Sequence, residues 1–325
     1  MTTLAIDAAA LEKLVSAAVA APSIHNSQPW RFRLEPATST VEVRADRTRA
    51  VPAADPQGRA LYVSVGAAVL NLRVAARHLG WAPEVRLLPD PAEPDLLAAV
   101  ELDAAAAAPA PGNDRLYEAI WRRHSSRLPF TGEPVPKAVL DELVTVAHAE
   151  GAGLHLPDHT ETARLLHLTA EAERRNTTDE AQRTESRSWI RSGEAPPYGI
   201  PVGALGPQDL AGHVPMRDFS AIHAAEHQAP ALFEHEPRIA VLGTDRDTPE
   251  DWLRAGLALE HVLLAATIHG VRASLLHQAM EWPNLRWEAR DPRDRPGYVQ
   301  MLVRLGYGPE GAPTPRLTAR EVLEP

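Results

Sequence analysis

The stretch GAAVLNLRVAARHLG, residues 66–80, has a counterpart 190 residues further along the chain, GLALEHVLLAATIHG at residues 256–270. Glycine begins and ends both stretches, and three alanines of the first recur at the equivalent positions of the second. An earlier pair, LEKLVSAAVA at residues 11–20 and LDELVTVAHA at residues 140–149, matches at an offset of 129. Two matches in the same order indicate an internal duplication.

The two offsets differ by 61 residues, so the second copy carries an insertion of about that length between its matched segments. By this alignment the insertion falls within about residues 155–235. Residues 174–230 are rich in charge, proline and glycine, as a covering segment would be, and we expect a lid-like insertion. The alanine- and proline-containing stretch 104–111 predicts a linker between a first, truncated half at 1–105 and a second at 112–325.

Apolar spacing predicts the elements that would carry a site. Apolar residues recur at helical intervals over residues 11–19, and Pro22 ends this helix because the residue before a proline is pushed out of the helical region. Residues 61–79 and 252–268 predict further helices, the second of them capped by Thr248. Strands are predicted at residues 30–34, 41–43, 85–88, 239–242 and 299–303.

The composition excludes several classes of function. The chain has 325 residues, of which 44% are hydrophobic, a formal net charge of −10 and no cysteine. The acidic balance argues against nucleic acid or an anionic membrane as the partner, and the missing cysteines remove disulfides and thiolate chemistry. No run approaches the apolar length of a membrane-spanning helix, and the N-terminus is acidic where a secretion signal is basic. We therefore expect a cytoplasmic protein whose partner is a small molecule.

Polar groups gather in two segments. The first, APSIHNSQPW at residues 21–30, joins a predicted helix to a predicted strand, and its two prolines restrain the loop. The side chains of Ser23, Asn26 and Gln28 suit the polar edge of a flat heterocycle. The second segment, RRHSSR at residues 122–127, follows a predicted helix. Such a stretch is often a solvated helix end, but arginine forks beside a serine hydroxyl also suit a phosphate group.

On these two segments the chain resembles the FMN-dependent nitroreductase family, and its fused Acg-like branch in particular. The resemblance spans nearly the whole chain. It implies an α+β nitroreductase-like fold in which two degenerate copies in one chain form an intramolecular pseudo-dimer. In that family an Arg-x-Ser-x-Arg motif binds the flavin phosphate and ribityl chain, and a Pro-Ser-x-x-Asn-x-Gln-Pro-Trp motif of the partner subunit contacts the flavin. The matching residues are Arg123, Ser125 and Arg127 for the first motif, and Pro22, Ser23, Asn26 and Gln28 for the second.

The duplication divides these motifs between the two copies. The position equivalent to Arg123 falls before residue 1 in the first copy. In the second copy, EGAGLH at residues 150–155 stands where the Pro-Ser-x-x-Asn motif would be. The resemblance therefore implies one complete site per chain, in a monomer that acts as a pseudo-dimer.

Two further assignments follow from the resemblance. The family presents backbone groups near flavin N5 from the loop after its long helix, and this loop aligns with Leu275, Leu276, His277 and Gln278. A C-terminal basic residue that reaches the phosphate aligns with Arg316. No catalytic acid, base or nucleophile is expected from the protein, because a flavin supplies the redox chemistry itself.

The function that the resemblance implies is an NAD(P)H-dependent oxidoreductase that binds FMN and reduces nitroaromatic, quinone-like or other electron-poor substrates. The alternative is a flavin-binding or flavin-sequestering protein whose insertion closes the site. A third function is a zinc hydrolase at His223, Glu226 and His227, since two histidines one helical turn apart can bind zinc while the glutamate acts as base. No third ligand is evident in the sequence, so we expect no metal site.

Overall fold

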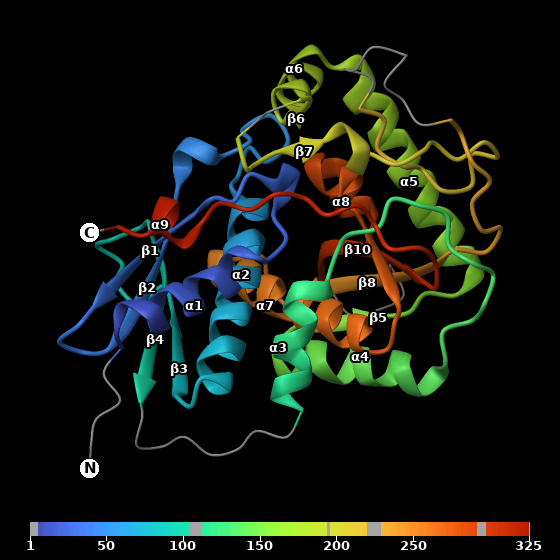
Figure 1. Ribbon diagram of the computed structural model, residues 1–325. Helices are drawn as coiled ribbons and strands as arrows, with labels where there is room; N and C mark the ends of the chain where they lie inside the picture. Colours follow the sequence, from blue (N-terminus) through green and yellow to red (C-terminus); the bar gives the residue numbers. More distant parts are fainter. Residues whose placement is uncertain (1–5, 104–111, 194–195, 220–228, 291–296, 325) are drawn as a thin grey trace.

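Two four-stranded antiparallel sheets, with helices packed between and around them, make up an α+β fold (Figure 1). The computed structural model describes residues 6–103, 112–193, 196–219, 229–290 and 297–324. The helices are α1 (Ala8–Val19), α2 (Arg59–His78), α3 (Asn113–Arg122), α4 (Lys137–Ala149), α5 (His159–Thr178), α6 (Glu180–Ser188), α7 (Pro249–Ile268), α8 (Pro283–Glu288) and α9 (Ala319–Val322). The strands are β1 (Trp30–Glu35), β2 (Thr40–Ala45), β3 (Ala82–Leu87), β4 (Leu96–Asp103), β5 (Gly153–His155), β6 (Ile190–Arg191), β7 (Ile200–Pro201), β8 (Arg238–Thr244), β9 (Arg272–Leu276) and β10 (Tyr298–Gly306).

The two large sheets have the same strand order. The first runs β1-β2-β4-β3 and the second β5-β8-β10-β9, and every neighbouring pair is antiparallel. In chain order, α1, β1, β2, α2, β3 and β4 of the first half correspond to α4, β5, β8, α7, β9 and β10 of the second. The main difference is the connection before the second strand, which is residues 36–39 in the first half and 156–237 in the second. The longer connection contains α5, α6, β6 and β7, which lie together at the top of Figure 1.

Helices α2 and α7 cross in contact at the centre of the molecule, and the crossing point is made of glycine (Figure 1). A Cβ on Gly66 would lie 2.2 Å from the carbonyl oxygen of Leu253, and a Cβ on Gly256 would lie 2.1 Å from that of Val63. Both distances are shorter than any real contact of this kind, so only glycine permits this approach of the backbones. The start of α7 is fixed by a capping box between Thr248 and Asp251.

The apolar core extends across the two halves. Leu253, Leu257 and Leu264 of α7 pack into the cluster formed by α1, α2 and the first sheet. The C-terminal segment also returns to the first sheet, where the amide of Glu324 donates to the carbonyl oxygen of Phe32 at 2.8 Å. The halves therefore share buried surface.

The predicted helices and strands named above are confirmed, but five strands were not predicted. These are β4, β5, β9 and the two-residue strands β6 and β7. The stretch expected to be a linker, residues 104–111, lies outside the described residues. One expectation was wrong: α2 is long and apolar enough to span a membrane by length and composition. Since 89% of the qualifying window is buried inside the protein, α2 packs as a core helix does.

We predict that Gly256→Ala destabilises the fold by about 3 kcal/mol or more, because the added methyl group meets backbone atoms that cannot rotate away. Gly132→Ala is the matched control, since a Cβ at Gly132 meets nothing within 4 Å and that glycine does not need a positive φ. Urea unfolding monitored by circular dichroism measures both variants. Equal stability of the two would show that the crossing is not constrained as described.

Candidate functional site

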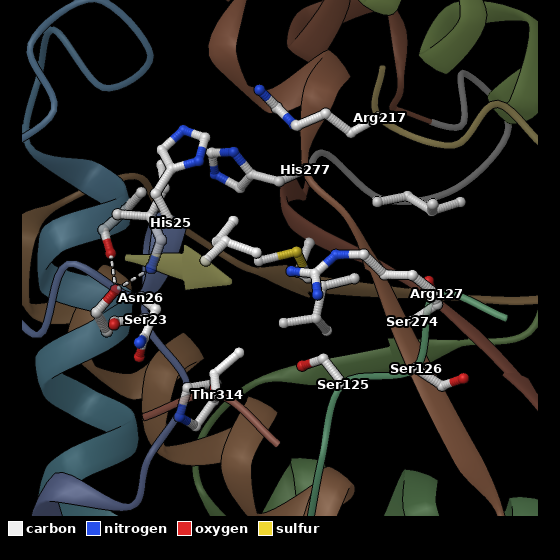
Figure 2. A pocket seen from close by; sticks show the side chains of 18 of the residues that line it. Ser23, His25, Asn26, Ser125, Ser126, Arg127, Arg217, Ser274, His277 and Thr314 are labelled. Carbon is white, nitrogen blue, oxygen red and sulfur yellow. Dashed lines mark hydrogen bonds between the residues drawn. The ribbon is translucent and has the colours of Figure 1, made fainter. Parts of the chain in front are cut away.

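One pocket lies where α2, α7, the 122–127 segment, the C-terminal segment and the long insertion meet. It encloses about 1180 Å³ of empty space, including solvent at its mouth. In Figure 2 the side chains of Arg127 and Ser125 lie on one side of the cavity, and those of Ser23, Asn26 and Thr314 lie on the other.

The arginine-serine segment is held in place by the second sheet. Arg123 follows the last turn of α3, and the amide of Ser126 donates to the carbonyl oxygen of Ala273 at 2.8 Å. The C-terminal segment passes so close that a Cβ on Gly311 would lie 2.7 Å from the carbonyl oxygen of Ser125. The strand edge and this close approach fix the backbone of the segment, so that Arg123, Ser125 and Arg127 all line the pocket.

Two guanidinium groups of the pocket have no carboxylate partner among the described residues. Arg127 donates to the carbonyl oxygen of Ala204 at 2.8 Å, and Arg316 donates to Asn26 Oδ1 at 2.9 Å. Burial lowers the pKa of Arg127 to about 10, with Arg217 contributing, and lowers that of Arg316 to about 9, with Arg123 contributing and Glu260 opposing. A buried cation that is not directly paired with a carboxylate is costly, and an anion bound in the pocket would relieve that cost.

The 22–28 loop uses most of its polar groups to hold itself and its neighbours together. Ser23 Oγ accepts from the amide of Gln28 at 3.0 Å. Asn26 Nδ2 donates to the carbonyl oxygens of Gly199, at 2.8 Å, and Pro315, at 2.9 Å. His25, Asn26 and Gln28 all have φ near +50°, in the left-handed region that asparagine tolerates and histidine and glutamine rarely adopt. The loop thus joins the insertion to the C-terminal segment at the wall of the pocket.

Two buried side-chain polar atoms of this loop, His25 Nε2 and Ser27 Oγ, have no hydrogen-bond partner among the described residues. Burial lowers the pKa of His25 to about 3, so the ring is neutral at physiological pH. A buried, unpaired polar atom at a strained position is characteristic of a group that contacts a ligand.

Beside His25 lies a chain of buried charges that the sequence did not reveal. Arg59 approaches His277 Nε2 at 2.8 Å, and His277 Nδ1 lies 3.1 Å from Glu281 Oε1. Because a guanidinium can only donate, Nε2 must accept and Nδ1 must carry the proton, so His277 is neutral and donates to Glu281. Arg217 of the insertion forms a buried ion pair with the same carboxylate. Burial alone would raise the pKa of Glu281, but Arg217 and His277 lower it to about 2.

Comparison with known proteins decides the family. The nitroreductase family model matches residues 120–282. The chain belongs to the nitroreductase family. It is 32% identical over 324 residues to the Mycobacterium tuberculosis H37Rv protein named "Putative NAD(P)H nitroreductase Rv3131", covering 98% of this chain and 92% of that protein.

The chain is also similar to two further proteins. The protein of the same strain named "Putative NAD(P)H nitroreductase acg" is 29% identical over 315 residues, covering 97% of this chain and 94% of that one. Among solved structures, the FMN-dependent nitroreductase NfnB of Mycobacterium smegmatis, in complex with NADPH, aligns with a TM-score of 0.40 and 14% identity. That alignment covers 64% of this chain and 96% of NfnB.

Most of the residues assigned from the nitroreductase motifs lie together in the pocket. The lining includes Pro22, Ser23, Asn26, Arg123, Ser125, Arg127, Leu275, Leu276, His277, Gln278 and Arg316. Gln28 is not part of it. Its side chain is fully buried and holds two segments, donating to the carbonyl oxygen of Pro197 at 2.9 Å and accepting from the amide of Leu317 at 2.9 Å.

The segment expected to be a loop after the long helix has a different structure. Leu275 and Leu276 end strand β9, and Gln278 begins the short 3-10 helix η5 (Gln278–Glu281). The pairing of β9 with β10 explains the difference, because residues 272–276 exchange hydrogen bonds with the centre of the second sheet.

The zinc motif at His223, Glu226 and His227 lies outside the described residues. Within the part of the chain that the structure describes, no group of three or more histidine or acidic side chains could hold a metal ion.

We predict that Arg217→Met destabilises the protein by about 3–5 kcal/mol at pH 7, because it leaves Glu281 buried without its cation. Arg33→Met is the control, since the side chain of Arg33 is 40% exposed and solvent screens its pair with Glu42, so its loss should have little effect on stability. Because the pKa of Glu281 is lowered to about 2, its ionised carboxylate stabilises the fold fully above pH 4.5. This contribution is lost as the pH falls toward about 2. Thermal unfolding at pH 7 measures both variants, and a cost below that of Arg33→Met would contradict the pairing.

Proposed function

We propose that this chain binds one FMN in the pocket and is an NAD(P)H-dependent oxidoreductase for nitroaromatic, quinone-like or other small electron-poor substrates. The observation that carries the proposal is the pair of buried guanidinium groups, Arg127 and Arg316, that lack a carboxylate among the described residues. They stand at positions matched to the family's phosphate-binding residues. A phosphate monoester carries close to two negative charges at neutral pH. It would pair with Arg316 and with the neighbouring Arg123, while Arg127 would hold the adjoining part of the same anionic cofactor.

The other groups of the pocket fit the rest of a flavin mononucleotide. Ser125 offers a hydroxyl beside the arginines, and Val63, Leu259 and Phe219 offer apolar surface for a flat ring system. The unpaired Nε2 of His25 offers one hydrogen bond to a polar ring edge. Backbone groups at residues 275–278 line the same pocket. This combination of anion site, apolar walls and few polar contacts is typical of cofactor sites.

The flavin, when bound, supplies the hydride chemistry, and the protein's residues bind and orient it. Arg123 and Arg316 would fix its charged end, Arg127 would hold the adjoining part, and the 22–28 loop would limit how its ring can turn. No acid-base pair is required of the protein for hydride transfer between a nicotinamide, the flavin and an electron-poor acceptor.

We predict that Arg127→Ala weakens FMN binding by roughly tenfold to a hundredfold, because a charge-assisted hydrogen bond contributes about 1.5–3 kcal/mol. Arg44→Ala is the control: Arg44 also lies in an ion-pair cluster, with Glu42 and Glu93, but on the first sheet and outside the pocket lining. Fluorescence titration of FMN against each variant measures the affinity, with circular dichroism to verify folding. Unchanged affinity in a folded Arg127→Ala variant would contradict the phosphate site.

We further propose that the chain is a pseudo-dimer of two degenerate copies, with the first half near residues 1–105 and the second from 112 onward. The matched sequence stretches and the shared strand order of the two sheets support this interpretation. The position where a second site would lie is filled by Glu150, which is buried and paired with Arg73 and with His261. Such a filled position leaves one site per chain.

A second candidate function, flavin sequestration, is favoured by how the insertion covers the pocket. The insertion's Ile200, Met216 and Phe219 line the cavity. Its backbone also binds the motif residues, through Gly199 to Asn26 and through Ala204 to Arg127. An insertion fastened at several points would restrict access of a nicotinamide or substrate to the flavin.

Gly206→Ala tests whether the insertion limits access. Gly206 has φ +74°, and a Cβ there would lie 2.5 Å from the carbonyl oxygen of Arg127, so alanine should push the insertion away from the pocket. Gly212→Ala is the matched control, with φ +70° and nothing within 4 Å of an added Cβ. We predict that anaerobic bleaching of bound flavin by NADPH is faster in Gly206→Ala than in Gly212→Ala if the insertion seals the site. Fast bleaching of the unmodified protein, unchanged in both variants, would exclude sequestration.

A further inference from the structure

A buried carboxylate lies directly behind the arginine side of the pocket. Glu260, in the middle of α7, has no exposed surface, and its Oε1 lies 3.3 Å from Nε of Arg123, whose side chain is 4% exposed. At the equivalent position of the other central helix, 190 residues earlier, stands the fully buried Leu70. An apolar side chain is therefore accommodated at one copy of this position, while the copy nearest the pocket carries a charge.

The guanidinium groups of Arg123 and Arg316 converge in front of this carboxylate. Both donate to the carbonyl oxygen of Ala20, Arg123 at 3.1 Å and Arg316 at 3.3 Å. Two like charges that share one oxygen repel each other, and Glu260 is the carboxylate that offsets them among the described residues. Arg123 and Arg316 also line the pocket, whereas Glu260 does not.

Several buried polar atoms at and around Glu260 make no hydrogen bond within the described part of the chain. Both of its carboxylate oxygens, both side-chain polar atoms of Asn71 on α2, and Nε of Arg123 and Arg316 lack hydrogen-bond partners among the described residues. Such groups are ordinarily satisfied by ordered water, which also gives a proton a route to a buried acid. Burial raises the pKa of Glu260 to about 7, against the opposing effects of Arg123, Asn71 and Arg316.

We propose that Glu260 is the exchangeable counter-ion of the phosphate site and takes up one proton when a phosphate monoester binds beside Arg123 and Arg316. This inference rests on the proposed function. In the free protein the ionised carboxylate offsets the two arginines. A bound phosphate takes over that role and repels the carboxylate, so a proton from solvent adds to a Glu260 oxygen and the charge of the site stays balanced. Glu260 is thus a positioning residue that acts through Arg123 and Arg316.

The sign of the effect on affinity follows from this linkage. Above pH 7 the free protein holds Glu260 ionised, and binding must be accompanied by proton uptake, so affinity falls as the pH rises. One linked proton sets a limit of tenfold per pH unit. The phosphate of FMN, with a second pKa near 6, is almost fully ionised above pH 7 and adds little to the slope. Burial, Arg123 and Arg316 lower the pKa of His124, which also lines the pocket, so this ring is neutral in the free protein above pH 7. Proton uptake by His124 would persist in Glu260→Gln, which distinguishes the two groups.

The test is FMN affinity of the full-length, flavin-freed chain between pH 7 and 8.5, for the unmodified protein, Glu260→Gln and Glu173→Gln. Glu173 is the matched control because burial likewise raises its pKa to about 7, but it faces Arg217 and lies outside the pocket lining. We expect a threefold to tenfold loss of affinity per pH unit in the unmodified protein and in Glu173→Gln. Glu260→Gln should bind FMN more tightly at pH 8.5 and show no such slope. Riboflavin, which lacks the phosphate, should show no dependence on Glu260.

Calorimetric titration in two non-phosphate buffers of different ionisation enthalpy counts the protons directly and needs no variant. Uptake approaching one proton per FMN at pH 8, absent in Glu260→Gln, supports the inference. No proton uptake in the unmodified protein, or an unchanged slope in Glu260→Gln, overturns it while leaving FMN binding intact. Failure of every form to bind FMN would instead overturn the proposed function.

Discussion

The close crossing of α2 and α7 is the constraint on which the rest of the structure depends. Gly66 and Gly256 let the two backbones meet, and each helix then carries one wall of the pocket. Ser64 of α2 accepts from the amide of Ile24 at 3.2 Å and so holds the 22–28 loop. Glu260 of α7 holds Arg123. A wider crossing would separate the loop from the arginine segment, and neither half of the chain has a complete set of these groups.

The pocket shows how buried charge is distributed when a site has to receive an anion. Glu281 is surrounded by Arg217 and His277, so it contributes a fixed ion pair that attaches the insertion to the fold. Arg127 and Arg316 have only carbonyl, amide and hydroxyl oxygens as partners among the described residues. The first arrangement is electrostatically complete, whereas the second leaves positive charge for a ligand. Glu260 lies between these two cases, because burial disfavours its charge and Arg123 favours it.

Periodicity and local motifs predicted much of the fold because they depend on neighbouring residues. The capping box at Thr248 and the helix end before Pro22 are local, and both are confirmed. Strand β4 was missed because Leu96–Val100 is buried at every position and has no polar alternation. Strand β9 was missed because its pairing partner, β10, lies more than 20 residues away in the sequence.

The same contrast between local patterns and long-range contacts applies to the pocket. The residues of the two motifs were identified because each motif is contiguous, and eleven of the twelve assigned residues line one pocket. The partners Arg59, Arg217 and Glu281 were not identified, since they come from three distant segments that only the fold brings together. Glu260 did leave a signal: it is the single acidic or basic side chain, histidines aside, in the matched stretch 256–270, and its equivalent in the first copy is Leu70. The two hydrogen bonds of the Gln28 side chain left no signal in the sequence, because their partners are backbone atoms of remote segments.

The most direct test is the amount of flavin bound per chain, measured with the mass of the particle that binds it. The purified protein should be yellow, release one FMN per chain on denaturation, and retain that ratio as a monomer in native mass spectrometry. A split site in one chain requires this result. Two FMN per chain, binding only in a dimer of chains, or a colourless protein that FMN cannot reconstitute would contradict it.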